Sequence, residues 1–234
     1  MMMTLIVVLV VSGALLAGAA WGIYGSLSKP VEGFLVALAG GSLLLSVVTE
    51  LIEPSVDKAG LLPAFVGVAV GAVVFTAVDY LINEKWGSEQ GGGLLAAITL
   101  DGIPENLALG VALIGAGPME VAALAGSILL SNLPEAAGGA KEMAGSGISK
   151  GRAMLLWGGT AALLSVAAIA GNLLLDTAGE GTLGIIRCVA AGAVVASLST
   201  EVFPQAFKED SYSAGIATAL GVLLALGLGE LGGG

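Results

Sequence analysis

The chain has 234 residues, of which 56% are hydrophobic and 11% are charged, and its formal net charge is −10. A soluble core has no room for so many long apolar runs, so the composition predicts an all-α integral membrane protein with one polytopic domain over residues 1–234. The acidic balance argues against nucleic acid as a partner and against a polybasic membrane anchor. Histidine is absent and Cys188 is the only cysteine, which excludes imidazole chemistry and an intrachain disulfide.

Eight apolar segments are each close to the roughly 20 residues that a helix needs to cross a bilayer. In chain order they cover 4–23, 33–53, 62–83, 93–116, 119–140, 153–175, 181–203 and 212–231. The first segment lacks the positive flank of a signal peptide and is interpreted as a spanning helix.

The basic residues predict the orientation. Alternating spans would place on one side Lys29, Lys85, Lys141, Lys150, Arg152 and Lys208, whereas Lys58 would lie in a loop on the other. Because cytoplasmic loops are enriched in lysine and arginine, this pattern predicts a multi-pass protein of the cytoplasmic (inner or plasma) membrane with both termini outside.

The second and seventh segments end alike. They read SVVTELIEP and SLSTEVFP, sharing Ser–x–x–Thr–Glu and a following proline. These helices would run in opposite directions, as in an inverted repeat with three helices on each side of a central pair. Glu50 and Glu201 are predicted in the last turn or so of their helices, either as entrance and exit groups or as solvated acids.

Small and aromatic residues indicate how the helices pack and where they end. Gly67 and Gly71 form a small–xxx–small pair, which predicts close packing of the third helix against a neighbour. Trp21, Trp86 and Trp157 lie near predicted span ends, where the amphipathic ring suits the membrane interface.

The central segments, 93–116 and 119–140, each carry the pattern polar–x–x–Pro–Glu. Residues four apart share a helix face, as Asp101 and Glu105 do in the first segment and Ser131 and Glu135 in the second. Each proline lacks a backbone donor, so a carbonyl one turn earlier is freed and the helix can kink.

Charged groups in mid-membrane are costly and are functional by default, and oxygen-rich sites suit hard cations. The predicted metal ligands are Asp101, Glu105, Ser131, Asn132 and Glu135, with Asn106, Glu50 and Glu201 on a secondary pathway. The alternative is that the acids are protonated and form structural hydrogen bonds between helices. The chain is not predicted to be an enzyme, because no histidine-dependent nucleophile and no phosphate-binding loop are present.

With these motifs in place, the chain resembles the ZIP (Zrt/Irt-like protein) family of divalent metal transporters, as a histidine-free divergent member. The resemblance rests on DGIPEN (101–106) and SNLPEA (131–136), with support from LIEP in the second span and from Glu201 in the seventh. It implies eight helices in a 3+2+3 arrangement (helices 1–3 over about 4–83, the central pair over about 93–140, helices 6–8 over about 153–231).

The resemblance also implies a metal site between the fourth and fifth helices. Glu105 and Glu135 match the family's bridging glutamates, Asp101 and Ser131 match positions usually held by histidine or glutamine, and Asn132 matches a second polar ligand. Gly102 stands where an asparagine is usual, and residues 153–171 lack the acid that the family's sixth helix often supplies.

The expected function is transport of a divalent cation across the membrane through this carboxylate site, inward by analogy with the family. The lipid bilayer surrounds the protein, and the resemblance is also compatible with a homodimer. The cargo metal is expected among Mn, Fe, Zn, Cd, Co and Mg, and an all-oxygen shell favours the harder ions. One alternative is a non-transporting ZIP-like sensor or scaffold whose buried acids are structural. Another is a proton or monovalent-cation pathway through the same carboxylates.

Overall fold

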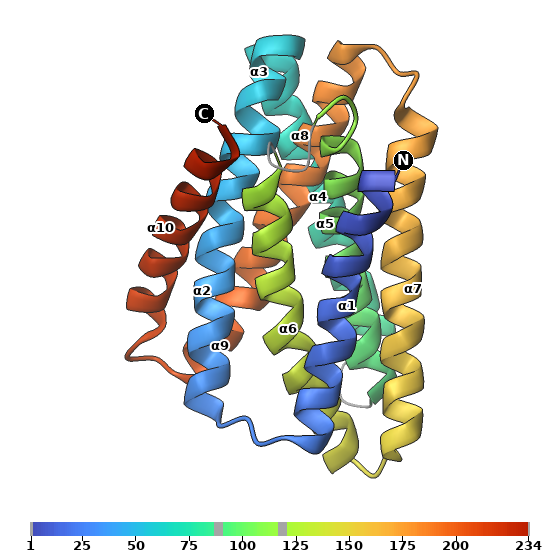
Figure 1. Ribbon diagram of the computed structural model, residues 1–234, viewed down its shortest axis with the longest axis vertical. Helices are drawn as coiled ribbons and strands as arrows, with labels where there is room; N and C mark the ends of the chain where they lie inside the picture. Colours follow the sequence, from blue (N-terminus) through green and yellow to red (C-terminus); the bar gives the residue numbers. More distant parts are fainter. Residues whose placement is uncertain (1, 87–90, 117–120, 234) are drawn as a thin grey trace.

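The computed structural model describes residues 2–86, 91–116 and 121–233, and within these ranges it is helical without a strand. The side chains of residues 2, 3, 83–86, 91–98, 100, 101, 232 and 233 lie outside the description. The helices are α1 (Met2–Tyr24), α2 (Lys29–Val47), α3 (Glu53–Ala59), α4 (Leu61–Trp86), α5 (Gly91–Ala112), α6 (Ala122–Gly145), α7 (Lys150–Leu175), α8 (Glu180–Ser197), α9 (Phe203–Glu209) and α10 (Ala214–Gly233) (Figure 1). Two π-helical segments, η1 (Val48–Ile52) and η2 (Leu198–Val202), join α2 to α3 and α8 to α9.

Six helical segments among the described residues are long and apolar enough to cross a membrane: Thr4–Tyr24, Lys29–Ala59, Leu61–Ile82, Lys150–Leu175, Glu180–Glu209 and Ala214–Leu231. Large apolar side chains on these helices face outward, as Leu9, Leu62 and Leu155 do. An apolar outer surface is compatible with a multi-pass membrane protein, because lipid tails rather than water would contact it. The helices that carry the two acidic motifs, α5 and α6, are outside this set of six.

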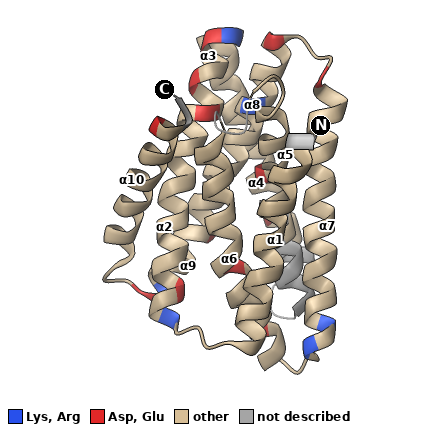
Figure 2. Ribbon diagram, viewed as in Figure 1, with Lys and Arg blue, Asp and Glu red and all other residues tan. Residues whose placement is uncertain are grey.

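Both chain termini lie toward the same end of the bundle, which we call the terminal end (Figure 1). The opposite end, the basic end, holds the connections from α1 to α2, from α6 to α7 and from α9 to α10. Most lysine and arginine residues lie there (Figure 2). Three contacts tie these connections together: Lys29 Nζ lies 3.1 Å from Glu209 Oε2, Lys141 Nζ donates to the Leu27 carbonyl at 2.7 Å, and the Lys150 ammonium lies 5.0 Å from the centre of the Tyr24 ring.

The helices pack in matched pairs, α1 with α6 and α7 with α5, and also α2 with α10 and α8 with α4. A glycine permits close approach in each pair, because an added Cβ would overlap the facing helix: Gly22 faces Ala137 O, Gly171 faces Leu107, Gly221 faces Leu38 O, and Gly71 faces Val189 O. Gly67 likewise faces Cys188 on α8, which confirms the predicted close packing of this helix.

The segments η1 and η2 coincide with the repeated Thr–Glu motif. In each, a backbone N–H bonds five residues back, from Glu53 to Val48 O and from Phe203 to Leu198 O. The prolines that follow sit in the first turn of α3 and α9, where a backbone donor is not needed. The prediction that Glu50 and Glu201 lie in the last turn or so is wrong, because α3 and α9 continue these helices by seven residues each.

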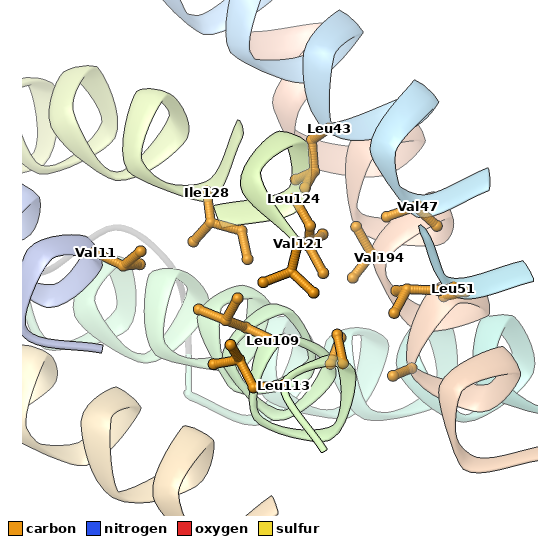
Figure 3. Close-up of a cluster of buried hydrophobic side chains, with 14 of the residues drawn as sticks. Val11, Leu43, Val47, Leu51, Leu109, Leu113, Val121, Leu124, Ile128 and Val194 are labelled. Carbon is orange, nitrogen blue, oxygen red and sulfur yellow. The ribbon is translucent and has the colours of Figure 1, made fainter. Parts of the chain in front are cut away.

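An apolar cluster occupies the terminal half of the bundle, where α1, α2, α5, α6 and α8 meet (Figure 3). Its fully or nearly fully buried members include Val11, Leu43, Val47, Leu51, Leu109, Leu113, Val121, Leu124, Ile128 and Val194. The interpretation of Trp157 as an interfacial residue is wrong: its ring is 0% exposed and packs between α1, α6 and α7. The ring belongs to a buried cluster with apolar residues of α1 and α6, such as Leu15 and Met143, so helix packing turns it inward and away from a lipid-facing position.

Candidate metal centre

Two glutamates from the paired motifs lie near each other in the middle of the bundle. Glu105 of α5 is 4% exposed, and Glu135 of α6 is half-buried. The Glu135 carboxylate is within electrostatic range of Glu105 and also of Glu201 in η2. The fold thus brings an acid of η2, distant in sequence, to the acids of the consecutive helices α5 and α6.

A cavity of about 370 Å³ leads from Glu135 to the basic end. Its walls come from α2, from α6 and from η2 with α9. Ser131 and Glu135 both line it, as their spacing of one helical turn predicts, and Glu201 faces them from η2. Between Ser131 and Glu142, also on the wall, the helix rises by about 16 Å, so the cavity reaches from the middle of α6 almost to its end.

The opposite side of the site is filled by the apolar cluster. On α5, Leu109 and Leu113 follow Glu105 toward the terminal end, and on α6, Leu124 and Ile128 precede Ser131. All four side chains are at most 7% exposed. Solvent access to Glu135 therefore lies on the side of the basic end in this conformation.

The neutral candidates differ in how much hydrogen-bonding capacity they have left. Asn132 Nδ2 donates to the Val11 carbonyl of α1 at 3.1 Å, so its amide nitrogen holds two helices together. Asn106 Nδ2 donates to Gly102 O at 2.9 Å, whereas its Oδ1 is buried without a hydrogen-bond partner in the described part of the chain. An unpaired buried acceptor is rare in folded proteins, which makes Asn106 Oδ1 available to a cation.

The Asp101 side chain lies outside the described residues, although its backbone belongs to α5. Its neighbour Gly102 packs against Leu164 of α7, and any Cβ there would overlap that side chain. A ligating asparagine at this position would need Leu164 to move. Leu164 on α7 therefore fills the space beside the position where the ZIP family usually has an asparagine.

Among the residues whose side chains are described, no group of three or more acids and cysteines is close enough to hold a metal ion directly. The predicted five-ligand site therefore stays a prediction. Glu105 and Glu135 are brought together, Ser131 joins Glu135 on the cavity wall, and Asn132 is engaged with α1.

Glu50 has a structural partner that the sequence does not reveal. Its Oε1 accepts the Leu124 backbone N–H of α6 at 2.8 Å, so a side chain from η1 caps the first turn of α6. Carboxylates are favourable there because the first N–H groups of a helix lack partners and the helix dipole is positive. The secondary-pathway role predicted for Glu50 remains untested by this contact.

Arg187 of α8 makes the complementary contact at the end of α5. It is 7% exposed, and its Nη2 donates to the Val111 carbonyl at 3.0 Å. A guanidinium at a helix C-terminus is favoured by the negative end of the dipole. Glu50 and Arg187 together hold the end of α5 and the start of α6 against helices α2 and α8. Sequence reasoning missed both, since a cap supplied by another helix has no local signal.

Comparisons with known proteins do not assign a family. No family model matches the sequence, and no curated protein is found to be similar to it. The ZIP resemblance accordingly rests on the two motifs at 101–106 and 131–136 and on the residues that accompany them.

Proposed function

We propose that this protein is a ZIP-type transporter that moves a divalent metal cation across the cytoplasmic membrane through a carboxylate site between α5 and α6. The observation that carries the proposal is the position of Glu135, which lies on the wall of a cavity of about 370 Å³ and within electrostatic range of Glu105 and Glu201. Buried like charges repel one another, and a divalent cation between them offsets that repulsion.

In this proposal α5 and α6 also cross the membrane, which brings the number of spans to eight. With 22 and 24 residues they are about 33 and 36 Å long, enough for a hydrocarbon core of about 30 Å. The basic end would then be cytoplasmic by the positive-inside rule, with both termini outside. The matched packing of α1 with α6 and of α7 with α5 supports two sets of three helices around a central pair.

Glu105 and Glu135 bind the ion directly in this proposal, and Asp101 supplies a third anionic ligand. Ser131 adds a neutral oxygen from the cavity wall, and the free Oδ1 of Asn106 supports the secondary role given to that residue. Carboxylate and carbonyl oxygens suit manganese and magnesium better than the softer ions of the panel.

In this proposal the conformation is an inward-facing state, a reading supported by the cavity that reaches the basic end and the apolar cluster that fills the terminal half. Transport would require the opposite arrangement to form in turn. By analogy with the ZIP family, the four-helix unit that contains α5 and α6 would move against the remaining helices.

The test is uptake into proteoliposomes across a panel of Mn²⁺, Fe²⁺, Zn²⁺, Cd²⁺, Co²⁺ and Mg²⁺. We expect saturable uptake of at least one metal, lost when Glu105→Gln and Glu135→Gln are combined. Glu230→Gln, an exposed acid in the last turn of α10, is the matched control and is expected to keep wild-type uptake. Absence of uptake of every metal by folded wild-type protein would rule the proposal out.

A sensor or scaffold is the second candidate, favoured by the lack of three converging acids among the described side chains. Thermal unfolding separates the two readings before any flux is measured. Metal-dependent stabilisation that the double glutamine variant loses supports a metal site, whereas no shift with any metal favours the scaffold. Flux that persists but ignores divalent ions would indicate a proton or monovalent-cation pathway.

A further inference from the structure

Glu32 is a buried acid that no predicted motif includes. It lies in the first turn of α2 and is 8% exposed, although the first turn of a helix at the end of a bundle is ordinarily solvated. Its carboxylate rests on Gly138 of α6, and a Cβ on that glycine would overlap Glu32 Oε1. Glu32 and Gly138 both line the cavity that leads to Glu135, so the carboxylate faces this space.

Within the described part of the chain, the Glu32 carboxylate has no hydrogen-bond or ion-pair partner. The two nearest cations are engaged elsewhere: Lys29 pairs with Glu209 at 3.1 Å, and Lys141 donates to the Leu27 carbonyl at 2.7 Å. A buried carboxylate without a partner is costly, and in native proteins such groups are normally compensated by a ligand, an ion or ordered water.

The surroundings of Glu32 are strongly acidic. Glu142 and Glu209 lie within electrostatic range of it and also line the cavity, with Glu201 and Glu135 deeper inside. Lys208 is the basic residue on the same wall. The cavity mouth therefore attracts cations and repels anions.

The size and spacing of these groups select a particular form of ion. Around Glu32, no group of three or more described acids is close enough to ligate a bare metal ion together. The volume of about 370 Å³, however, has room for a divalent ion with its six-water shell, since each water takes about 30 Å³. Magnesium in particular loses its waters reluctantly and is often held through them.

We propose that Glu32, with Glu142 beside it, forms an outer-sphere site that holds a hydrated divalent cation at the mouth of the cavity. The carboxylates accept hydrogen bonds from the ion's water molecules, and Gly138 leaves the space for Glu32 to reach them. The site's place on a transport path rests on the proposed function, with this mouth site lying between Glu135 and the solvent. The binding itself does not depend on transport.

The test measures Mn²⁺ binding by electron paramagnetic resonance of the free ion, using purified full-length chain in which Glu105→Gln and Glu135→Gln remove the deep site. We expect this protein to retain a single weak Mn²⁺ site. Adding Glu32→Gln should weaken that site by about 10- to 100-fold, as for other outer-shell partners of metals. Adding Glu230→Gln instead should leave it unchanged.

Hexaamminecobalt(III) distinguishes outer-sphere from direct binding, because its six ammonia ligands do not exchange. It is expected to displace Mn²⁺ from the residual site. Failure to displace Mn²⁺, absence of a residual site, or residual binding that ignores Glu32→Gln would each overturn the proposal. Uptake assays on wild-type protein report separately on transport, so a failed transport proposal and a failed mouth site give different results.

A second variant tests the geometry without changing the charge. Gly138→Ala places a methyl group where Glu32 Oε1 lies and is expected to weaken residual Mn²⁺ binding while every carboxylate is kept. Gly159→Ala on α7 is the control, because a Cβ there meets nothing within 4 Å. Equal Mn²⁺ affinity in the two alanine variants would contradict the assignment of Glu32.

Discussion

Glu50 and Glu201 occupy related π-helical segments but have different surroundings. Glu50 in η1 is bound to the first turn of α6 beside the apolar cluster, whereas Glu201 in η2 lines the cavity with Glu135. The two halves differ because α6 presents its N-terminus, which needs an acceptor, to η1, and presents the small residues Gly138 and Gly139 to the other half. The repeated Thr–Glu motif therefore lies against the packed terminal half of the bundle in η1, whereas in η2 it lines the cavity that leads to the basic end.

Thiol labelling gives the largest expected contrast between the halves. Ser55 and Gln205 each follow the proline after their π-helical segment, but Ser55 is 0% exposed and Gln205 lies exposed on the cavity wall. In a Cys188→Ala background, a charged maleimide is expected to modify Gln205→Cys almost completely and Ser55→Cys hardly at all. Similar labelling of both positions would show that the terminal half is as open as the basic half.

Truncating a buried side chain in the terminal half of the bundle should cause the largest loss of stability. Leu124 is 1% exposed in the apolar cluster, so Leu124→Ala is expected to lower the free energy of unfolding by about 2–5 kcal/mol. Val202→Ala, on the cavity wall, should cost less because that side chain is only half-buried. Reversible unfolding by SDS in mixed micelles measures both, and an equal loss would contradict the distinction.

Loss of the Glu50 cap should have a smaller effect. Glu50→Ala removes the acceptor for the Leu124 N–H and is expected to cost about 0.5–2 kcal/mol, as for other N-caps. Glu50→Gln keeps an accepting oxygen and should cost less. The same unfolding assay separates these variants, and a Glu50→Ala protein as stable as wild type would show that the cap contributes nothing.

The smallest effect is expected at the turn between α9 and α10. There the Ser213 hydroxyl donates to Asp210, and this hydrogen bond, with the Ser213 and Tyr212 backbone N–H groups, lowers the pKa of Asp210 below its ordinary value of 3.8. A lowered folded-state pKa stabilises the fold above the ordinary value, and that contribution is lost as the pH falls through the lowered one.

Ser213→Ala should therefore reduce the unfolding temperature slightly at pH 7, and the difference from wild type should shrink below about pH 4. The corresponding connection in the terminal half, at Gly60, uses a positive φ of 90° and no titratable group. Gly60→Ala is thus expected to destabilise the protein equally at both pH values, which makes it the control for the titration.

The parts of this fold that depend on local sequence were predictable. Long apolar runs predict the helices, and Gly67 with Gly71 predicts a close contact that the structure places against α8. Glu105 and Glu135 were predicted to meet because each sits after a proline in one of two adjacent segments, and they do lie within electrostatic range.

The remainder depends on partners from distant segments. Neither Glu50 nor Arg187 has a neighbour in sequence that identifies it as a helix cap, and the helix ends they bind are 74 and 76 residues away. Glu32 looks like a solvated acid in a first helical turn, since only the fold brings Gly138 opposite it. The interpretation of Trp157 failed for the same reason. A position near the end of a span does not determine whether the ring faces lipid or a neighbouring helix.

Glu50 and Arg187, the two residues that cap helices at the terminal end, are not expected to tolerate being swapped with each other. A surface ion pair can often be inverted by swapping its members, because each charge recognises only the other. Here each side chain binds a helix end instead. Glu50 accepts a backbone N–H at the start of α6, and Arg187 donates to a backbone carbonyl at the end of α5, so each interacts favourably with the dipole of its helix. Exchanging Glu50 and Arg187 would place an arginine at the positive start of α6 and a glutamate at the negative end of α5. Because like charges would then face each other at both helix ends, the two residues are not interchangeable.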